Sequence, residues 1–299
     1  MKKIKDIFSP YAYIRKFVNW QLKRSGLKFR SLETENYHIT YWDTETELPP
    51  LIMIPAFAAE TQYSWHKQVG ALHSHFRLII PNLIYFGGSS MKKEKSYRIK
   101  DQVQAMQELI DHLGIEKMTL CGASYGGVVA AELAIGQQEN ISRLVLTNCP
   151  LKYNNEKDLQ AVLDAFGLHT KKELLVPDNY QQLYNLFGIT YYKRPFIPKF
   201  VFKDIHKHLY RDADDRRKLV EASTSELEQL TSKAYSLTIP TLLIWGEKDL
   251  LCPVYVGEQL KAHFGSTTAL KVIPRTAHLP NYEKPRMYNK ILLRFLKEG

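Results

Sequence analysis

The sequence predicts an α/β protein with a mostly parallel central sheet, helices flanking that sheet, and a helical insertion. A continuous apolar run at residues 51–54 and mainly apolar segments at 76–80 and 241–245 are typical of strands buried on both faces. Segments with helical periodicity separate these runs, and strands that alternate with helices favour a parallel sheet. Between about residues 150 and 237 the alternation stops, and prolines interrupt helical patterns rich in Tyr, Phe and Lys. We therefore expect an α/β core that carries a helical cap.

The same patterns predict the elements in chain order. Strands are expected at residues 37–42, 51–54, 76–80, 117–120, 141–146, 241–245 and 270–273. Helices of the core are expected at residues 64–73, 100–113, 128–135, 254–264 and 284–296. The predicted organisation is a basic extension at 1–30, a core at 31–149 and 238–299, and a cap insertion at 150–237.

The charge of the chain lies mainly at its beginning. Residues 1–30 contain nine Lys and Arg residues and one acidic residue, Asp6, so most of the formal net charge of +10 belongs to this extension. The remainder is close to neutral, and we expect no nucleic-acid partner. The cysteines form no CxxC pair and no metal-binding spacing, which indicates reduced thiols and a cytoplasmic location. They are Cys121, Cys149 and Cys252.

The extension predicts an amphipathic, basic helix. Ser9-Pro10 is a typical helix start and Gly26 a typical stop. Between them apolar residues recur at helical spacing, namely Tyr11, Ile14, Val18 and Leu22, with Phe17 and Trp20 widening the stripe. This face either lies on an anionic membrane surface or packs on the protein body or a partner subunit. No apolar run is long enough to span a membrane, and we expect no signal peptide.

A serine motif follows the expected strand at 117–120. Gly122-x-Ser124-x-Gly126 lies where that strand meets the helix expected at 128–135. The two glycines lack the Cβ atoms that would collide in so sharp a turn, and the new helix directs free N–H groups at the serine. The motif alone also fits an ordinary Gly/Ser-rich turn.

Two further residues give the serine a chemical role. Ser124, Asp249 and His278 each come just after an expected strand, and in parallel sheets sites form at the carboxyl ends of strands. A serine hydroxyl needs a base to take its proton, and a carboxylate orients that histidine. Glu247 is the alternative to Asp249 as the carboxylate that orients His278. The pairs His73-x-His75 and His206-x-His208 lack further metal ligands at a recognisable spacing, so we expect neither a metal nor a cofactor.

These regions together resemble the α/β-hydrolase superfamily over residues 35–299. The resemblance rests on Gly122-x-Ser124-x-Gly126, on residues 245–249, and on His278 with 283–285 following, in the order Ser, Asp, His. It implies acyl transfer by Ser124, Asp249 and His278. The N–H of Tyr125, directly after the nucleophile, suits an oxyanion hole. By resemblance the second donor is the N–H of Phe57, although Pro55-Ala56 stands where the family usually has His-Gly.

The cap and residues 85–89 are similar to the monoacylglycerol-lipase-like branch of the superfamily. We therefore expect a serine carboxylic-ester hydrolase acting on acyl esters such as monoacylglycerol-type lipids, with peripheral membrane contact through residues 1–30 as one possibility. Acyl-thioester hydrolysis and carbon–carbon bond hydrolysis use the same triad and stay open, as does a catalytically silent ligand-binding homologue. Epoxide hydrolases and dehalogenases use a carboxylate nucleophile, so Ser124 argues against them.

Overall fold

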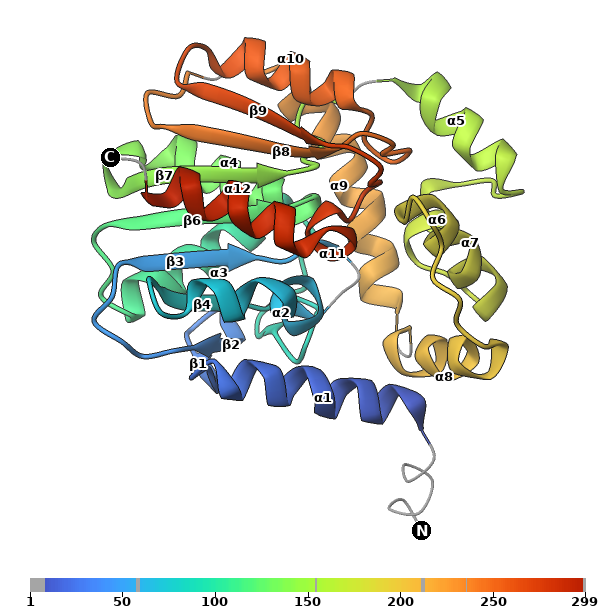
Figure 1. The fold of residues 1–299 in the computed structure, drawn as a ribbon, viewed down its shortest axis with the longest axis horizontal. Helices are drawn as coiled ribbons and strands as arrows, with labels where there is room; N and C mark the ends of the chain where they lie inside the picture. The colour runs from blue at the N-terminus through green and yellow to red at the C-terminus, as the bar shows by residue number, and fades with distance from the viewer. Residues whose placement is uncertain (1–8, 58–59, 154, 211–212, 235, 298–299) are drawn as a thin grey trace.

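A single nine-stranded sheet forms the centre of the protein (Figure 1). The computed structural model describes residues 9–57, 60–153, 155–210, 213–234 and 236–297. The strands are β1 (Lys28–Glu33), β2 (Tyr37–Asp43), β3 (Pro50–Ile54), β4 (Arg77–Pro81), β5 (Ser90–Met91), β6 (Met118–Ala123), β7 (Ile141–Thr147), β8 (Thr241–Gly246) and β9 (Thr268–Ile273). Their order is β1-β2-β4-β3-β6-β7-β8-β9, and β5 pairs with β2. The architecture predicted from the sequence, a mostly parallel central sheet flanked by helices, is confirmed.

The sheet is parallel from β4 across to β9, and antiparallel where β2 pairs with β1, β4 and β5. Every residue of β6 and of β8 is buried, which agrees with their mainly apolar sequences. Because β6, β7 and β8 are parallel neighbours, the residues that follow them meet at one edge of the sheet.

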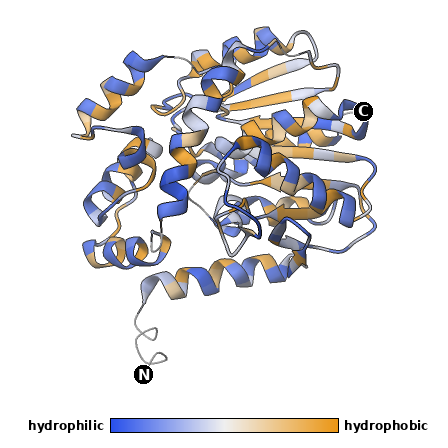
Figure 2. Ribbon diagram, turned by 180° about the vertical axis from the view of Figure 1, so that it is seen from behind, coloured by the Kyte–Doolittle hydropathy of each residue, from blue (hydrophilic) through white to orange (hydrophobic). Residues whose placement is uncertain are grey.

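Helices cover both faces of the sheet. The helices are α1 (Pro10–Arg24), α2 (Thr61–Leu72), α3 (Ile99–His112), α4 (Tyr125–Gly136), α10 (Val254–Phe264), α11 (Pro280–Glu283) and α12 (Pro285–Lys297), with a 3-10 turn, η1 (Gln138–Asn140), before β7. One core cluster joins α1, α2 and α12 to the sheet, and a second joins α3, α4 and α10 to its other face. Figure 2 shows the resulting pattern, with hydrophobic strands inside and mixed helix surfaces outside.

The chain between β7 and β8 folds into helices that lie beyond the carboxyl ends of the strands (Figure 1). They are α5 (Glu156–Ala165), α6 (Lys171–Leu175), α7 (Tyr180–Thr190), α8 (Lys199–Leu209) and α9 (Asp214–Ser232). Two clusters of buried side chains hold them together, so many of their Leu, Phe and Tyr residues form the core of this cap. Several apolar side chains of the cap, Leu183, Leu186 and Phe187 among them, line a cavity together with Ser124.

The helix of the N-terminal extension packs on the protein body. Ser9 caps α1, with its hydroxyl accepting from the Ala12 N–H at 3.2 Å, and the α1 side chains Tyr11, Val18 and Leu22 are buried. Asp204 of α8 accepts hydrogen bonds from the Ser9 hydroxyl at 2.6 Å and the Tyr11 N–H at 2.9 Å. Helix α1 is therefore anchored to both the core and the cap.

Strand β1 was not expected from the sequence. It begins at Lys28, so the boundary at residue 30 drawn between extension and core falls inside a strand. Five of its six residues are exposed, and its alternating basic and apolar residues lack the apolar run by which the other strands were recognised. No helix in the described part of the chain is long and apolar enough to cross a membrane.

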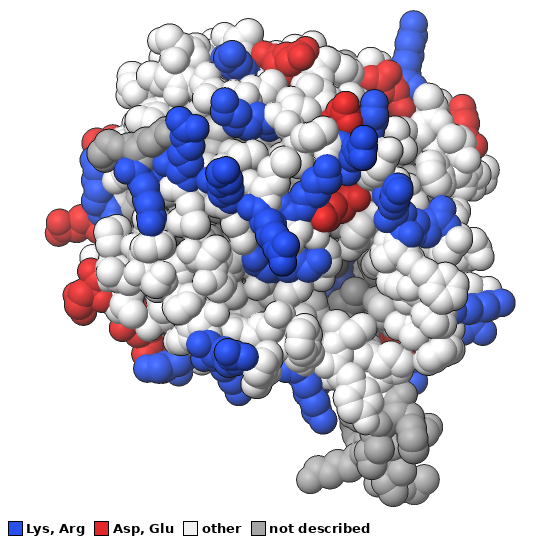
Figure 3. All heavy atoms as spheres, in the orientation of Figure 1, with Lys and Arg blue, Asp and Glu red and all other residues white. Residues whose placement is uncertain are grey.

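Basic side chains are prominent on the face viewed in Figure 3. Lys and Arg gather in a band across its middle, over the C-terminal helix α12, and again along α1 at its lower edge. Acidic side chains are fewer on this face. The basic character is therefore not confined to the N-terminal extension.

Candidate active site

Ser124 lies in the sharp turn between β6 and α4. Its backbone adopts φ 50° and ψ −122°, a conformation that non-glycine residues rarely take. The turn also brings other backbone segments very close. A Cβ atom on Gly122 would lie 2.4 Å from the carbonyl oxygen of Gly126, and one on Gly126 would lie 2.1 Å from the Pro55 carbonyl oxygen. Only glycine fits at positions 122 and 126, because a larger residue at either position would collide with neighbouring backbone. The close contacts of these glycines are more specific than an ordinary Gly/Ser-rich turn requires.

We predict that Gly126→Ala destabilises the protein by about 1–3 kcal/mol, because the added methyl group must displace the Pro55 backbone. Gly136→Ala, in the same helix, is the matched control: nothing lies within 4 Å of its added Cβ, and alanine favours helix by up to about 1 kcal/mol. Thermal and denaturant unfolding measure both effects. Equal stability of the two variants would contradict the close approach of the turn to the Pro55 loop.

The structure brings the predicted serine, histidine and aspartate side chains together. His278 Nε2 lies 2.9 Å from Ser124 Oγ, and His278 Nδ1 lies 2.8 Å from Asp249 Oδ2. Asp249 and His278 are 4% and 9% exposed. With the proton on Nδ1 donated to Asp249, Nε2 is free to accept the hydroxyl proton of Ser124.

Main-chain and amide groups fix the Asp249 carboxylate. Its Oδ1 accepts from the N–H groups of Leu251 at 2.9 Å and Cys252 at 3.0 Å. Its Oδ2 accepts from Nδ2 of Asn148, which follows β7 and has a φ of 47°. Asn148 Oδ1 in turn accepts from the Gly246 N–H at 3.3 Å. Asn148 was not among the site residues predicted from the sequence, yet it holds the Asp249 carboxylate in place.

Two glutamates near His278 have other partners. Glu247, the alternative carboxylate, accepts from the Arg275 N–H at 3.0 Å, while Asp249 contacts the imidazole. Glu283 accepts from the Ala277 N–H at 2.6 Å and from the Tyr192 N–H of the cap at 2.9 Å. Burial raises the pKa of Glu283, and these N–H groups oppose that rise. Glu283 therefore connects the loop that carries His278 to the cap.

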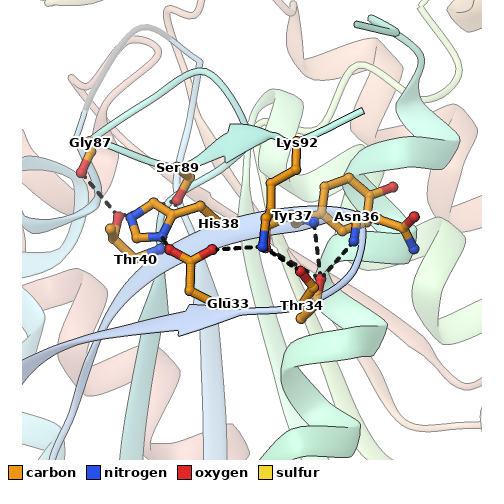
Figure 4. A network of polar contacts seen from close by, with 9 residues as sticks. All are labelled: Glu33, Thr34, Asn36, Tyr37, His38, Thr40, Gly87, Ser89 and Lys92. Carbon is orange, nitrogen blue, oxygen red and sulfur yellow. Dashed lines mark hydrogen bonds and ion pairs between the residues drawn. The ribbon is translucent and has the colours of Figure 1, made fainter. Parts of the chain in front are cut away.

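The two residues expected to form the oxyanion hole lie together beside Ser124. The ring of Phe57 packs edge-on against Tyr125 at 5.9 Å and against Phe86 at 5.2 Å. Phe86 belongs to the glycine-rich loop at residues 85–89, which hydrogen bonds tie to β2. Thr40 Oγ1 donates to the Gly87 carbonyl at 3.0 Å, as Figure 4 shows. This loop therefore holds the Phe57 ring through its contact with Phe86. The catalytic role of the two N–H groups remains a prediction.

Two cavities meet at Ser124, and Phe57 and His278 also line both. The larger has a volume of about 680 Å³, within the usual range of small-molecule sites. It runs between α1, α2 and the cap, and its apolar wall includes Leu183, Leu186, Phe187, Ile197 and Ile205. The smaller has a volume of about 150 Å³ and lies under α5, α6 and α9. Polar side chains, Lys171, Thr224 and Glu228 among them, contribute to its wall.

The side chains of His206 and the three cysteines lie outside the triad of Ser124, His278 and Asp249. His206 Nε2 lies 3.0 Å from the Pro177 carbonyl oxygen, and the described residues include no group of three or more potential ligands placed to hold a metal ion. Cys121, Cys149 and Cys252 are buried free thiols. Burial raises the pKa of Cys121 and of Cys149 to about 12, so these thiols are protonated at neutral pH.

Comparisons with known proteins agree with this architecture. The chain matches the family described as alpha/beta hydrolase fold over residues 49–285, and it belongs to that family. It is 24% identical to human epoxide hydrolase 4, across 96% of this chain and 79% of the relative. It is 23% identical to the human monoacylglycerol lipase ABHD6, across 96% and 87%. Its fold is similar to that of a bacterial membrane phospholipase A, with a TM-score of 0.83, 21% identity, and coverage of 97% and 92%.

Proposed function

We propose that this hydrolase is a serine carboxylic-ester hydrolase. The observation that carries the proposal is the chain of contacts from Ser124 through His278 to Asp249, at the junction of two cavities. Lipase names among the relatives support the same class. Another relative is named an epoxide hydrolase, but that chemistry uses a carboxylate nucleophile, whereas Ser124 presents a hydroxyl.

In the proposed mechanism, Ser124 Oγ attacks the ester carbonyl carbon while His278 Nε2 takes its proton. The N–H groups of Phe57 and Tyr125 stabilise the oxyanion, and each such donor is typically worth about 3 kcal/mol in the transition state. The tetrahedral intermediate collapses, His278 returns the proton to the departing alkoxide, and an acyl-enzyme remains. Water, deprotonated by His278, then releases the acid and restores Ser124. Asp249 stabilises the imidazolium in both halves of the reaction.

The two cavities suggest how an ester is placed. We assign the acyl chain to the larger cavity because its wall is mainly aliphatic and aromatic, and burial of each CH₂ group stabilises the complex by about 0.8 kcal/mol. The smaller cavity then receives the alcohol. Lys171 and Thr224 supply polar groups there, which suits a hydroxyl-bearing leaving group such as glycerol. Burial lowers the pKa of Lys171, which agrees with an ammonium group held away from bulk water.

One observation favours a thioester substrate as the second candidate. Basic side chains lie around the larger cavity, namely Lys67, Lys193, Arg275 and Lys284. They complement the negative charge of a coenzyme A or acyl-carrier thioester. The same triad hydrolyses thioesters without change in mechanism.

A panel of glycerol esters, methyl esters and thioesters of increasing acyl length tests these assignments. We expect kcat/KM to rise from acetyl to longer chains, and glycerol esters to be preferred over thioesters. Lys171→Met should lower kcat/KM for a glycerol ester about ten-fold, since charge-assisted hydrogen bonds contribute about 1.5–3 kcal/mol, and should leave the methyl ester unaffected. Lys172→Met is the matched control, because Lys172 pairs with Glu221 at the surface. Preference for thioesters, or an equal effect on both esters, would contradict the assignment.

A further inference from the structure

Large apolar side chains are exposed on two segments that border the larger cavity. Phe17 and Trp20 of α1 are 56% and 50% exposed. Phe196 is 95% exposed and Phe200 is 65% exposed, on the segment that leads into α8 and on its first turn. We call these four residues the aromatic rim. Single exposed apolar residues are common on soluble proteins, but a group beside a cavity is typical of an interaction surface.

The two halves of the rim belong to neighbouring elements. Asp204 of α8 holds the first turn of α1 through Ser9 and Tyr11. Ile14 of α1 and Ile197 of the cap both line the larger cavity. Along the sequence, Phe17 is three residues from Ile14, and Phe196 is next to Ile197. Each half of the rim therefore belongs to a segment that also supplies side chains to the wall of the cavity that contains Ser124.

Packing within the protein does not account for the rim. α1 attaches to the body through its opposite face, where Tyr11, Val18 and Leu22 are buried. On the outer face Phe17 stacks on Trp20 at 6.0 Å, and the Arg24 guanidinium lies 4.8 Å from the Trp20 ring centre. The helix therefore packs on the body through its inner stripe and exposes an outer stripe of aromatic and basic residues.

The charge around the rim identifies a partner. Residues 10–24 and 192–209 together contain nine Lys and Arg residues and one carboxylate, Asp204, which already accepts from Ser9 and Tyr11. Figure 3 shows the basic side chains along α1 and across the same face of the molecule. Trp and Phe insert at the boundary between lipid headgroups and acyl chains, and Lys and Arg bind anionic headgroups.

We propose that the aromatic rim docks this protein on an anionic lipid bilayer. In that orientation the larger cavity opens toward the lipid, and an acyl ester passes from the bilayer to Ser124 without full exposure to water. Docking is a property of the surface and does not depend on the chemistry proposed for the triad.

Flotation with vesicles of three parts phosphatidylcholine and one part phosphatidylserine tests the proposal. The wild-type protein should bind these vesicles more tightly than pure phosphatidylcholine. Raising NaCl from about 0.1 M to about 1 M shortens the Debye length from about 10 Å to about 3 Å and should weaken binding at least ten-fold. Lys16→Gln and Lys199→Gln should each lower affinity about five-fold, the equivalent of one basic contact with an anionic surface.

The decisive variant replaces Phe17, Trp20, Phe196 and Phe200 by serine. We expect vesicle binding to fall at least ten-fold, hydrolysis of a vesicle-embedded long-chain ester to fall with it, and hydrolysis of soluble p-nitrophenyl butyrate to stay unchanged. Val272→Ser is the control, since Val272 is 40% exposed on β9, at the opposite edge of the sheet from β1. Ser124→Ala should bind vesicles normally, which separates docking from catalysis.

Three results would overturn the proposal. The first is wild-type protein that does not bind the anionic vesicles, and the second is a rim variant that binds as tightly as wild type. The third is a wild-type dimer in light scattering that the rim substitutions dissociate, because the rim would then be an interface between copies of the chain.

Discussion

Ser124→Ala should reduce hydrolysis of p-nitrophenyl butyrate by about 10⁴-fold or more while the protein stays folded. The substitution removes the only atom that attacks the carbonyl in the proposed mechanism. It leaves the turn intact, because the hydrogen bond from the Ser124 main-chain N–H to the Thr147 carbonyl at 2.8 Å does not involve the side chain. Alanine also has no groups that would contact His278 unfavourably.

Steady-state rates and thermal unfolding of the same preparation measure this effect. A normal unfolding midpoint with lost activity is the expected combination. Undiminished turnover in Ser124→Ala would remove Ser124 from the reaction. Loss of activity together with loss of fold would show that the strained turn depends on its side chain, and Ser124→Gly would then test the nucleophile without the strain, since glycine accepts this backbone conformation.

Asp249→Asn should lower kcat by about 10⁴-fold. An asparagine amide has no charge to stabilise the imidazolium, and its NH₂ group can donate to Nδ1, which favours the wrong histidine tautomer. The amide oxygen can still accept from the Leu251 and Cys252 N–H groups, but the amide NH₂ group then faces Asn148 Nδ2, which is also a donor. We therefore expect a large loss of rate together with a loss of stability of about 1–3 kcal/mol, the usual cost of an unsatisfied buried donor.

Glu247→Gln is the matched control for this prediction. Glu247 lies two residues from Asp249 and accepts from the Arg275 N–H, so its replacement should change kcat less than three-fold. Equal losses in the two variants, or a larger loss in Glu247→Gln, would show that the wrong carboxylate has been assigned.

The strands and helices of the core could be predicted because their buried residues form local apolar patterns in the sequence. Strands β6 and β8 have mainly apolar sequences, and the helices of the core show helical periodicity or a run of small residues. From the parallel sheet, residues after neighbouring strands were expected at one edge, and the structure places Ser124, Asp249 and His278 in contact there. Strand β1 was not predicted because five of its six residues are exposed, so its sequence contains no apolar run.

Contacts made by folded loops were not predictable in the same way. Asn148 contacts Asp249 only because β7 and β8 end side by side. In the sequence, an asparagine after a strand indicates no more than an ordinary turn. Glu283 contacts Tyr192 across more than ninety positions of the chain. The division of the pocket into two cavities depends on how α5 to α9 pack, and no local pattern encodes that arrangement.

Residues 1–30 illustrate a different limit. Their composition indicated an amphipathic basic helix but left two uses for its apolar residues. Only the docking of α1 against α2 and α8 assigns Tyr11 and Val18 to the inner face and Phe17 and Trp20 to the outer one. Helical spacing alone had placed all of them in one widened stripe.

Reaction of the intact protein with a fluorophosphonate, followed by peptide mass spectrometry, tests the central claim most directly. The reagent phosphonylates only a serine whose hydroxyl is activated by a neighbouring base, and it requires no knowledge of the natural substrate. We predict a single stoichiometric adduct on Ser124, formed far more slowly in Asp249→Asn and absent in Ser124→Ala. No adduct on the folded wild-type protein, or an adduct on another residue, would contradict the assignment of Ser124 as the nucleophile.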